Sequence, residues 1–220
     1  LSLAATLVII TGGIDLSVGT LMTFTAVTAG VVLTYWGMPL PLGILAAIAA
    51  GVTSGFISGT LVARMKIPPF IATLGMMLIL KGLSLVISGT KPIYFNDTPS
   101  FPLLSTGSLI GGVIPGLPVP NGVVILFVLA LIISWVLNRT VLGRYCFALG
   151  SNEEAVRLSG VNADGWKVAI YALAGGICGI AGLLIASRLN SAQPALGLGY
   201  ELDAIAAVVI GGTSLAGGRG

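Results

Sequence analysis

One carboxylate stands apart from the other charges of this chain. Asp15 lies in the stretch "GGIDLSVG" (12–19), between the apolar lead-in "ATLVIIT" and a long apolar run. Asp15 or Ser17 could cap the helix that begins near residue 17, because a side-chain oxygen there accepts from free backbone N–H groups. An ionisable group at membrane depth is also a candidate functional group. The two roles are compatible, and we expect Asp15 both to cap this helix and to accept hydrogen bonds from a polyhydroxylated solute.

The same pattern occurs again near the other end of the chain. "GGTSLAGG" (211–218) shares the form GG-x-x-L-x-x-G with 12–19 and follows the apolar lead-in "AAVVI". Glycine pairs permit an unwound backbone, which is tolerated at membrane depth where it is buried in protein or lines a cavity. We therefore predict discontinuous helices at both stretches. The residues expected to line a translocation path at these breaks are Gly12, Gly13, Asp15, Ser17, Thr213 and Ser214.

Composition explains why such breaks would lie within a membrane. The chain is 56% apolar and only 8% charged, whereas about a quarter of the residues of a soluble domain are charged. Apolar runs of about 20 residues can cross the hydrocarbon core as helices. The sequence therefore predicts an all-α, polytopic membrane helix bundle. Its spans are expected at 17–35, 39–63, 70–88, 121–138 and 168–187, with partial spans at 1–11 and 204–212.

The basic residues predict an orientation. The connections 63–69 and 138–167 contain Arg64, Lys66, Arg139, Arg144, Arg157 and Lys167, whereas 88–122 and 188–203 contain Lys91 and Arg188. Cytoplasmic loops are enriched in Lys and Arg, so the first pair is expected inside. The lead-in 1–11 would then approach its break from inside and 204–212 from outside. Such an arrangement is typical of transporters built from inverted repeats. Lys81 lies within a span, where its long side chain can reach the outer interface.

The connection 139–167 contains a short helix with its own end signals. In "GSNEEAVRLSG" (150–160), Ser151 or Asn152 is expected as the N-cap, Glu153 and Glu154 occupy the first turn, and Gly160 is expected at the C-cap. One interpretation is an ordinary amphipathic surface helix. The other is a docking helix that transmits motion from a soluble partner. The residues assigned to docking are Ser151, Asn152, Glu153, Glu154, Ala155, Arg157 and Gly160.

Four polar residues near the expected outer end form a further candidate group. Asn190, Gln193, Glu201 and Asp203 lie in or beside the connection 188–203 and could surround an outer mouth. Loops are polar by default, so the alternative interpretation is that each is an ordinary solvated residue.

Several function classes lack the residues they need. The chain contains no His, and Cys146 and Cys178 stand far apart without a metal-ligand spacing. The sequence contains no nucleophile–base constellation that would predict an enzyme. It also contains no GxxxxGK[ST] loop that would predict nucleotide binding by this chain. Because basic residues are not interleaved with aromatic ones, nucleic acid is not an expected partner.

The sequence resembles a known family. "GGIDLSVG", "ALGSNEEAVRLSG" and "YELDAIAAVVIGGTSLAGGRG" closely resemble stretches of the ribose-type (monosaccharide) permeases of bacterial ABC importers, which are grouped with branched-chain amino-acid permeases. The resemblance covers the whole chain, with the motifs in the family's order and spacing. It implies a multi-pass protein of the bacterial inner membrane that imports a monosaccharide or a similar polyol. In that family the loop matching 150–160 resembles the coupling helix that contacts the ATPase.

The resemblance also implies partners. Such an importer contains a second permease copy in a homodimer, a cytoplasmic ABC ATPase and a periplasmic sugar-binding protein, with membrane lipid around the spans. ATP would be used by the ATPase, and this chain would bind no cofactor. Family members carry more spans than the five placed here, so we expect residues 1–220 to be a single transmembrane permease domain that is a fragment. The alternative is an ion-coupled secondary transporter, for which Asp15 would be the available ion-binding carboxylate.

Overall fold

The computed structural model describes residues 1–113 and 117–220. Residues 114–116 of the expected outward connection 88–122 lie outside the described part. The all-α class is confirmed, with one two-residue ladder in which β1 (Ile93–Tyr94) pairs antiparallel with β2 (Ser191–Ala192). The helices are α1 (Ser2–Ile10), α2 (Val18–Gly30), its π-helical continuation η1 (Val31–Tyr35), α3 (Leu40–Ala63), α4 (Pro69–Ile87), α5 (Leu103–Thr106), α6 (Leu109–Val113), α7 (Asn121–Arg139), α8 (Val141–Leu158), α9 (Ala163–Leu189) and α10 (Tyr200–Ile210).

In the described part of the chain, five helical segments are long and apolar enough to cross a membrane: α2 with η1, α3, α4, α7 and α9. They lie close to the expected apolar runs, but α9 begins at Ala163 rather than near 168. The side chain of Asn162 accepts from Gly165 N–H and caps this early start. Residues 139–167 are therefore mostly helical, comprising α8 and the first turn of α9.

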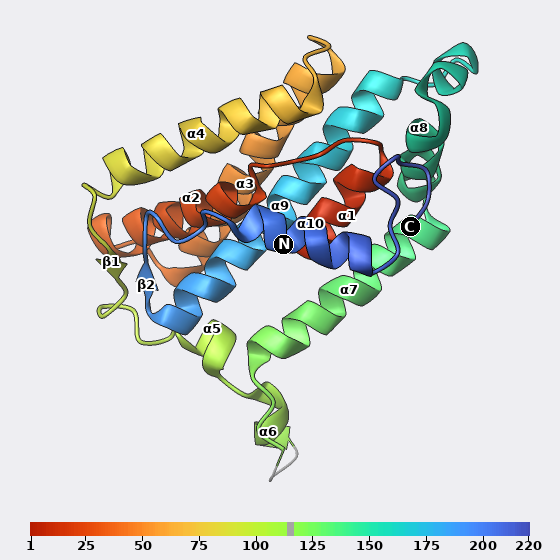
Figure 1. The fold of residues 1–220 in the computed structure, drawn as a ribbon. Helices are drawn as coiled ribbons and strands as arrows, with labels where there is room; N and C mark the ends of the chain where they lie inside the picture. Colours follow the sequence, from red (N-terminus) through yellow and green to blue (C-terminus); the bar gives the residue numbers. More distant parts are fainter. Residues whose placement is uncertain (114–116) are drawn as a thin grey trace.

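The centre of the bundle is a close antiparallel pair, α3 and α9 (Figure 1). Gly51, Gly55 and Gly59 recur every fourth residue on α3 and face α9. A Cβ added to Gly51 would strike the carbonyl oxygen of Gly175, and one added to Gly55 would strike that of Tyr171. Small residues at this spacing let the backbones of membrane helices approach closely, where van der Waals packing holds them.

The connections gather at two ends of the bundle. At one end, called the ladder end, β1 pairs with β2 and the Thr34 hydroxyl donates to the carbonyl oxygen of Tyr94 at 3.2 Å. At the other, called the α8 end, Lys66 of the α3–α4 turn contacts Asp164 at the start of α9. The two connections expected inside thus share one end, and the two expected outside share the other. Which end faces the cytoplasm remains a prediction.

The direction of α1 differs from the expectation. Leu1 and Ser2 line the same cavity as Ser105 and Arg188 at the ladder end, whereas the Ile10 carbonyl oxygen accepts from Gly218 N–H near α8. The helix therefore runs from the middle of the bundle toward the α8 end, and α10 points the same way (Figure 1). The lead-ins approach their breaks in parallel and are not inverted, which corrects the prediction for 1–11.

The physical reason is a reversal of the chain at the first break. Gly12 adopts φ +77°, a left-handed conformation that ends α1. Residues 13–17 then carry the chain sideways to Val18, and α2 returns to the ladder end, where Gly30 contacts Ile93. The prediction assumed that the chain continues across the membrane after the break.

Candidate functional site

The Asp15 carboxylate closes a tight turn between α1 and α2. Its Oδ1 atom accepts from Ser17 N–H at 2.8 Å and from the Ser17 hydroxyl at 2.6 Å. Asp15 is 6% exposed and Ser17 is 1% exposed. Because α2 begins at Val18, these bonds close the turn just before the helix, and neither side chain caps its first turn. The capping prediction is therefore corrected: Asp15 holds the entry to α2 rather than its free N–H groups.

The two oxygens of Asp15 have different surroundings. Both hydrogen bonds to Ser17 end on Oδ1, and within residues 1–113 and 117–220 no hydrogen bond reaches Oδ2. A carboxylate accepts through both oxygens, so Oδ2 is free to accept from a ligand while Oδ1 keeps the turn closed. The geometry thus accommodates a structural role and a binding role in one side chain.

The turn is anchored to α4 by Thr73, a residue that the sequence reasoning missed. Leu16 N–H donates to the Thr73 hydroxyl at 3.2 Å, and that hydroxyl, whose proton has the Pro69 carbonyl oxygen at 2.9 Å as its nearer acceptor, also lies 3.2 Å from the Ile14 carbonyl oxygen. Thr73 is fully buried. A break that the sequence shows only as a glycine pair is therefore fixed in place by a span about sixty residues away.

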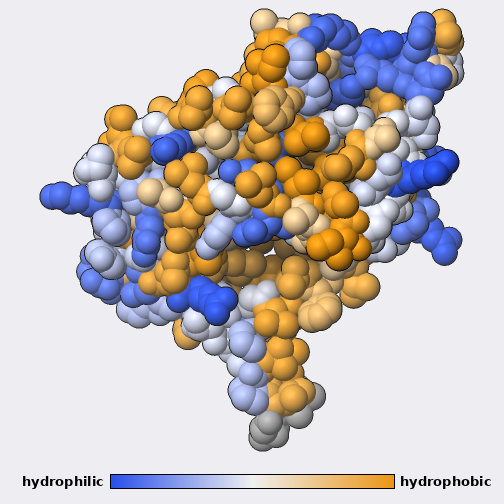
Figure 2. Space-filling model, viewed as in Figure 1, coloured by the Kyte–Doolittle hydropathy of each residue, from blue (hydrophilic) through white to orange (hydrophobic). Residues whose placement is uncertain are grey.

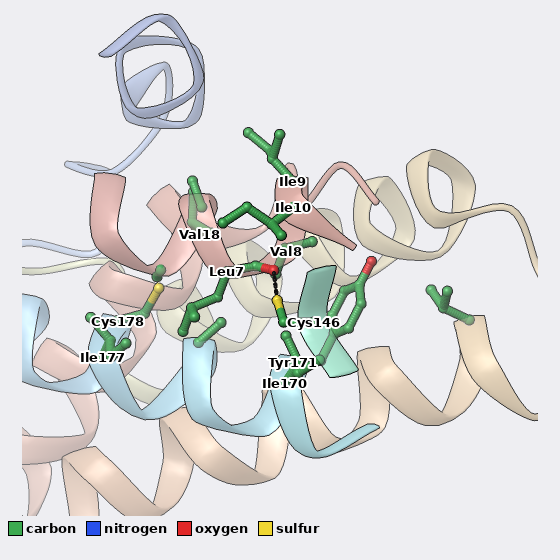
Figure 3. Close-up of a cluster of buried hydrophobic side chains, with 14 of the residues drawn as sticks. Leu7, Val8, Ile9, Ile10, Val18, Cys146, Ile170, Tyr171, Ile177 and Cys178 are labelled. Carbon is green, nitrogen blue, oxygen red and sulfur yellow. Dashed lines mark hydrogen bonds between the residues drawn. The ribbon is translucent and has the colours of Figure 1, made fainter. Parts of the chain in front are cut away.

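Tyr171 faces Gly13 from α9. A Cβ built on Gly13 would lie 2.6 Å from the Tyr171 hydroxyl oxygen. The Tyr171 side chain is 1% exposed, and its hydroxyl has no hydrogen-bond partner in the described residues. Figure 3 shows it beside Cys146, whose thiol donates to the Leu7 carbonyl oxygen at 3.3 Å. A side chain at 13 would have to displace this hydroxyl.

The second break repeats the geometry of the first. Gly13 N–H donates to the Val8 carbonyl oxygen at 3.2 Å, and Thr213 N–H donates to that of Val208 at 3.2 Å. In each break a left-handed glycine directly precedes the donor residue: Gly12 in the first break, and Gly212, at φ +101°, in the second. Gly12 therefore corresponds to Gly212, which shifts the expected alignment of 12–19 with 211–218 by one residue.

The two breaks touch through backbone rather than through their polar side chains. A Cβ on Gly217 would lie 2.9 Å from the Cα of Gly12. Thr213 is 9% exposed and Ser214 is half-buried. The Asp15 turn packs instead against α4 through Thr73. The structure thus brings Gly12 to the second break but leaves the Asp15 and Ser17 hydrogen bonds in a separate cluster.

The four expected outer-mouth residues do not form one group. Asn190 is the left-handed C-cap of α9, at φ +48°, and Glu201 is buried, accepting from Gly199 N–H at 3.1 Å beside Gly19. Gln193 is exposed. Asp203 lines an open cavity of about 790 Å³ between α7, α9 and α10, visible as a hollow in Figure 2. Its lining is mostly apolar, which suits hydrocarbon better than a sugar.

The segment assigned to docking is a separate short helix. The α8 backbone breaks at Asn152 (φ −161°, ψ 96°), and Asn152 Oδ1 accepts from Ala155 N–H at 2.9 Å. Asn152 is therefore the N-cap, and Ser151 is not. Gly160 adopts φ +81° just beyond the helix, as its predicted place at the C-terminus requires. We call residues 153–158 the docking segment.

An ionic cluster joins the docking segment to α9 and, through Asp164, to the α3–α4 turn. Arg157 contacts Glu153 at 2.7 Å and also Asp164, Lys66 contacts Asp164 at 2.7 Å, and Lys167 contacts Glu153. Partial burial raises the pKa of Glu153, but hydrogen bonds from Lys167 and Arg157 outweigh it and lower the pKa below its usual value. The cluster is therefore intact at neutral pH and weakens as the pH falls through the lowered pKa.

The remaining face of the docking segment is free. Glu154 and Ala155 are exposed, and Leu158 is 84% exposed. No ion pair to Glu154 occurs in the described residues. Figure 2 shows hydrophilic residues gathered over this end of the molecule. An exposed leucine beside an acidic residue is a surface that a protein partner can cover. Leu158 was not among the residues predicted to dock, although it directly follows Arg157 in the same helix.

Comparison with known proteins decides the family. The profile of the family described as branched-chain amino acid transport system / permease component matches residues 1–218. The chain belongs to this permease family. Its resemblance to the ribose-type branch is confirmed by relatives that align over nearly all of its length.

Three relatives illustrate the branch. The ribose import permease RbsC of Escherichia coli is 43% identical over 220 residues, covering 100% of this chain and 67% of the relative. The galactofuranose transporter permease YtfT of the same species is 42% identical over 221 residues (100% and 62%). The fructose import permease FrcC of Rhizobium meliloti is 40% identical over 221 residues (99% and 60%). The permease thus spans about two thirds or less of their length, and no solved structure matches it.

Family and fold together give the location. The relatives are bacterial import permeases, and this permease has five helical segments able to span a membrane in its described part. It is a multi-pass protein of the bacterial inner membrane. In Figure 2 a mostly apolar surface separates the hydrophilic residues of the α8 end from those of the ladder end, as a membrane-embedded band requires.

Proposed function

We propose that this permease is the transmembrane subunit of an ATP-driven importer of a monosaccharide or a similar polyol. The relatives named for ribose, fructose and galactofuranose support a sugar as the substrate class. ATP is bound by a separate cytoplasmic ABC ATPase, a second copy of this permease completes the membrane part, and a periplasmic binding protein delivers the sugar. This chain carries the path and binds no cofactor.

The observation that carries the proposal is the docking segment. Its inner face is tied to α9 and the α3–α4 turn by the Glu153–Arg157–Asp164 ion pairs, while its outer face leaves Glu154, Ala155 and Leu158 exposed. A helix clamped to the spans on one face and free on the other can pass motion from a partner to the bundle. We therefore assign contact with the ATPase to the free face, and positioning of the segment to Glu153 and Arg157.

The path is proposed to pass the helix breaks. Asp15 Oδ2 is the unengaged acceptor of the first break, while Thr213 and Ser214 supply hydroxyls at the second. Sugar hydroxyls both donate and accept, so a carboxylate and hydroxyl groups suit them. The cavity that Asp203 shares with Arg188 is mostly apolar and is not assigned to the path.

The docking assignment is tested with full-length permease co-expressed with its ATPase. Glu154→Lys, Ala155→Trp and Leu158→Glu should each reduce co-purification of the ATPase, because interface anchors typically cost about 2 kcal/mol or more when removed. Leu109→Glu is the matched control, since Leu109 is a 74% exposed leucine at the ladder end. Binding-protein-stimulated ATP hydrolysis in liposomes is measured in parallel. Wild-type association in all three variants would exclude the docking segment as the contact.

The buried Asp15 keeps an ion-coupled secondary transporter as the second candidate, because such transporters place an ion-binding carboxylate within the bundle. Uptake is measured after the proton gradient and membrane potential are collapsed with ATP maintained. Uptake by an ABC importer should continue, whereas loss of uptake would favour the second candidate.

A further inference from the structure

Three backbone segments that are far apart in the sequence meet at the α8 end. They are the end of α1 (Ile10–Gly12), the kink of α8 (Gly150–Asn152) and the tail that follows α10 (Gly217–Gly218). Gly218 N–H donates to the Ile10 carbonyl oxygen at 2.8 Å. We call this meeting point the backbone junction. It joins both helix breaks to the helix that carries the docking segment.

The junction has no room for side chains. A Cβ on Gly150 would strike the Ile10 carbonyl oxygen and lie 2.5 Å from Gly218 N. One on Gly217 would lie 2.9 Å from Gly12 N and 3.0 Å from the Gly150 carbonyl oxygen. Each segment therefore touches the other two directly through its main chain. A side chain can yield to a small displacement by changing its rotamer, whereas a backbone contact must move as a whole.

The junction lies between the docking segment and the breaks. Asn152, whose non-helical backbone begins the docking segment, directly follows Gly150 and Ser151. On the other side of Gly150, the first half of α8 is held to α1 by the hydrogen bond from Cys146 to Leu7. A displacement of the docking segment therefore reaches Gly150 first, and through it Ile10 and Gly218.

We propose that the backbone junction is the mechanical link through which the docking segment controls both helix breaks. The docking segment, the end of α1 and the tail after α10 move together as one body relative to the ladder end. Gly150 is a positioning residue for transport in this scheme. The proposal rests on the proposed function for the source of the motion, an ATPase bound at the docking segment.

The first test changes the junction by one methyl group. Gly150→Ala in the full-length permease pushes Ile10 and Gly218 apart. Gly75→Ala is the matched control, because Gly75 is a helical glycine of α4 with nothing within 4 Å of an added Cβ. We expect Gly150→Ala to keep ATPase association while the ratio of sugar taken up to ATP hydrolysed falls by about fivefold or more, an overpacking effect. An unchanged ratio in a normally assembled variant would overturn the proposal.

The second test does not depend on that variant folding. Spin labels are placed at Ser159 and Ala216, two exposed positions beside the docking segment and in the tail. A second pair joins Ser159 to Leu109 at the ladder end. Between the nucleotide-free and ATP-bound complexes, the 159–216 distance should stay constant and the 159–109 distance should change. A change in the first distance, or constancy of both, would overturn the proposal.

Failure of the proposed function gives a different result. If wild-type permease does not associate with an ABC ATPase, the proposed function fails at that step. If association is normal and the 159–216 distance changes, only the junction fails.

Discussion

The two helix breaks share a backbone and differ in their surroundings. In each, a left-handed glycine follows a Thr or Gly C-cap, and the next N–H donates to a valine carbonyl oxygen five residues earlier in the chain. The lead-in of the first break is buried throughout from Leu7 to Ile10, whereas the second buries Val208 but leaves Ile210 87% exposed. The same cap therefore ends a helix that is buried on all sides at the first break, and a helix that is buried on one face only at the second.

This difference shows what local sequence decides and what it does not. A short apolar helix followed by glycine forms the same cap in both environments, because the cap depends on local backbone conformation. The positions of the polar groups beyond the cap depend instead on the elements that pack against them. Asp15 lies in a turn anchored to α4, whereas Ser214 donates its backbone N–H to the nearby Arg219 carbonyl oxygen. The two breaks should therefore contribute unequally to sugar uptake. Substitutions at the two left-handed glycines, in contrast, should cost the same free energy of unfolding.

The largest expected effect concerns the charge that only the first break carries. Asp15→Ala leaves the buried N–H and hydroxyl of Ser17 without an acceptor, a loss of about 1–3 kcal/mol for each group. Sugar uptake should fall about tenfold or more. Asp15→Asn can keep an acceptor for Ser17 and removes the charge, so an uptake defect at normal protein abundance would isolate the charge. Ser214→Ala should reduce uptake less than Asp15→Asn, by about twofold, because it removes one half-buried hydroxyl from the second break and no charge.

Uptake and membrane abundance are measured together in cells that lack the native permease. Equal uptake in Asp15→Asn and wild type would leave Asp15 with the turn alone. An equal loss in Ser214→Ala and Asp15→Asn would show that the two breaks contribute alike to transport.

A smaller effect is expected from steric crowding at the position after each left-handed glycine. Gly13→Ala should destabilise the permease by about 1–3 kcal/mol through overpacking, because the new methyl group meets the Tyr171 hydroxyl. Thr213 already carries a side chain at the corresponding position, so Thr213→Ala should cost less. The measurement is the temperature of half-unfolding in detergent.

Tyr171→Phe provides the matched rescue for this crowding. The Tyr171 hydroxyl has no partner in the described residues, so removing it should cost little by itself and should relieve Gly13→Ala. Strictly additive effects in the double variant would show that the hydroxyl is not what Gly13 avoids.

Features set by local patterns could be predicted from the sequence. The five apolar runs, the glycine breaks, and the Asn152 and Gly160 ends of the docking segment each depend on residues within one or two turns. The close α3–α9 contact was not predicted, although Gly51, Gly55 and Gly59 have the spacing of small-residue helix interfaces.

Features set by long-range contacts could not. The reversal after Gly12 depends on where α2 and α4 lie. An apolar lead-in does not indicate in which direction its helix crosses the membrane. Glu201 looks like a loop residue in the sequence but is buried at the start of α10 against Gly19. Arg157 was assigned to docking, yet Asp164 at the start of α9 engages it, in addition to the local i,i+4 pair with Glu153. In each case the partner is remote or depends on a packing direction that periodicity does not carry.

The smallest expected effect tests whether the two caps are energetically the same. Gly12 and Gly212 both have positive φ, and a Cβ added to either would have open space, with no atom closer than 4.0 Å. Substitution by Ala should therefore cost only the strain of a left-handed L-residue, about 1–2 kcal/mol, at both sites despite their different burial. Gly75→Ala is the control without strain, and helix propensity should make it neutral or slightly stabilising. Half-unfolding temperatures of the three variants in detergent give the comparison. A much larger loss at Gly12 than at Gly212 would mean that burial around α1 enters the cap itself, and the two breaks would then differ in backbone energetics as well as in chemistry.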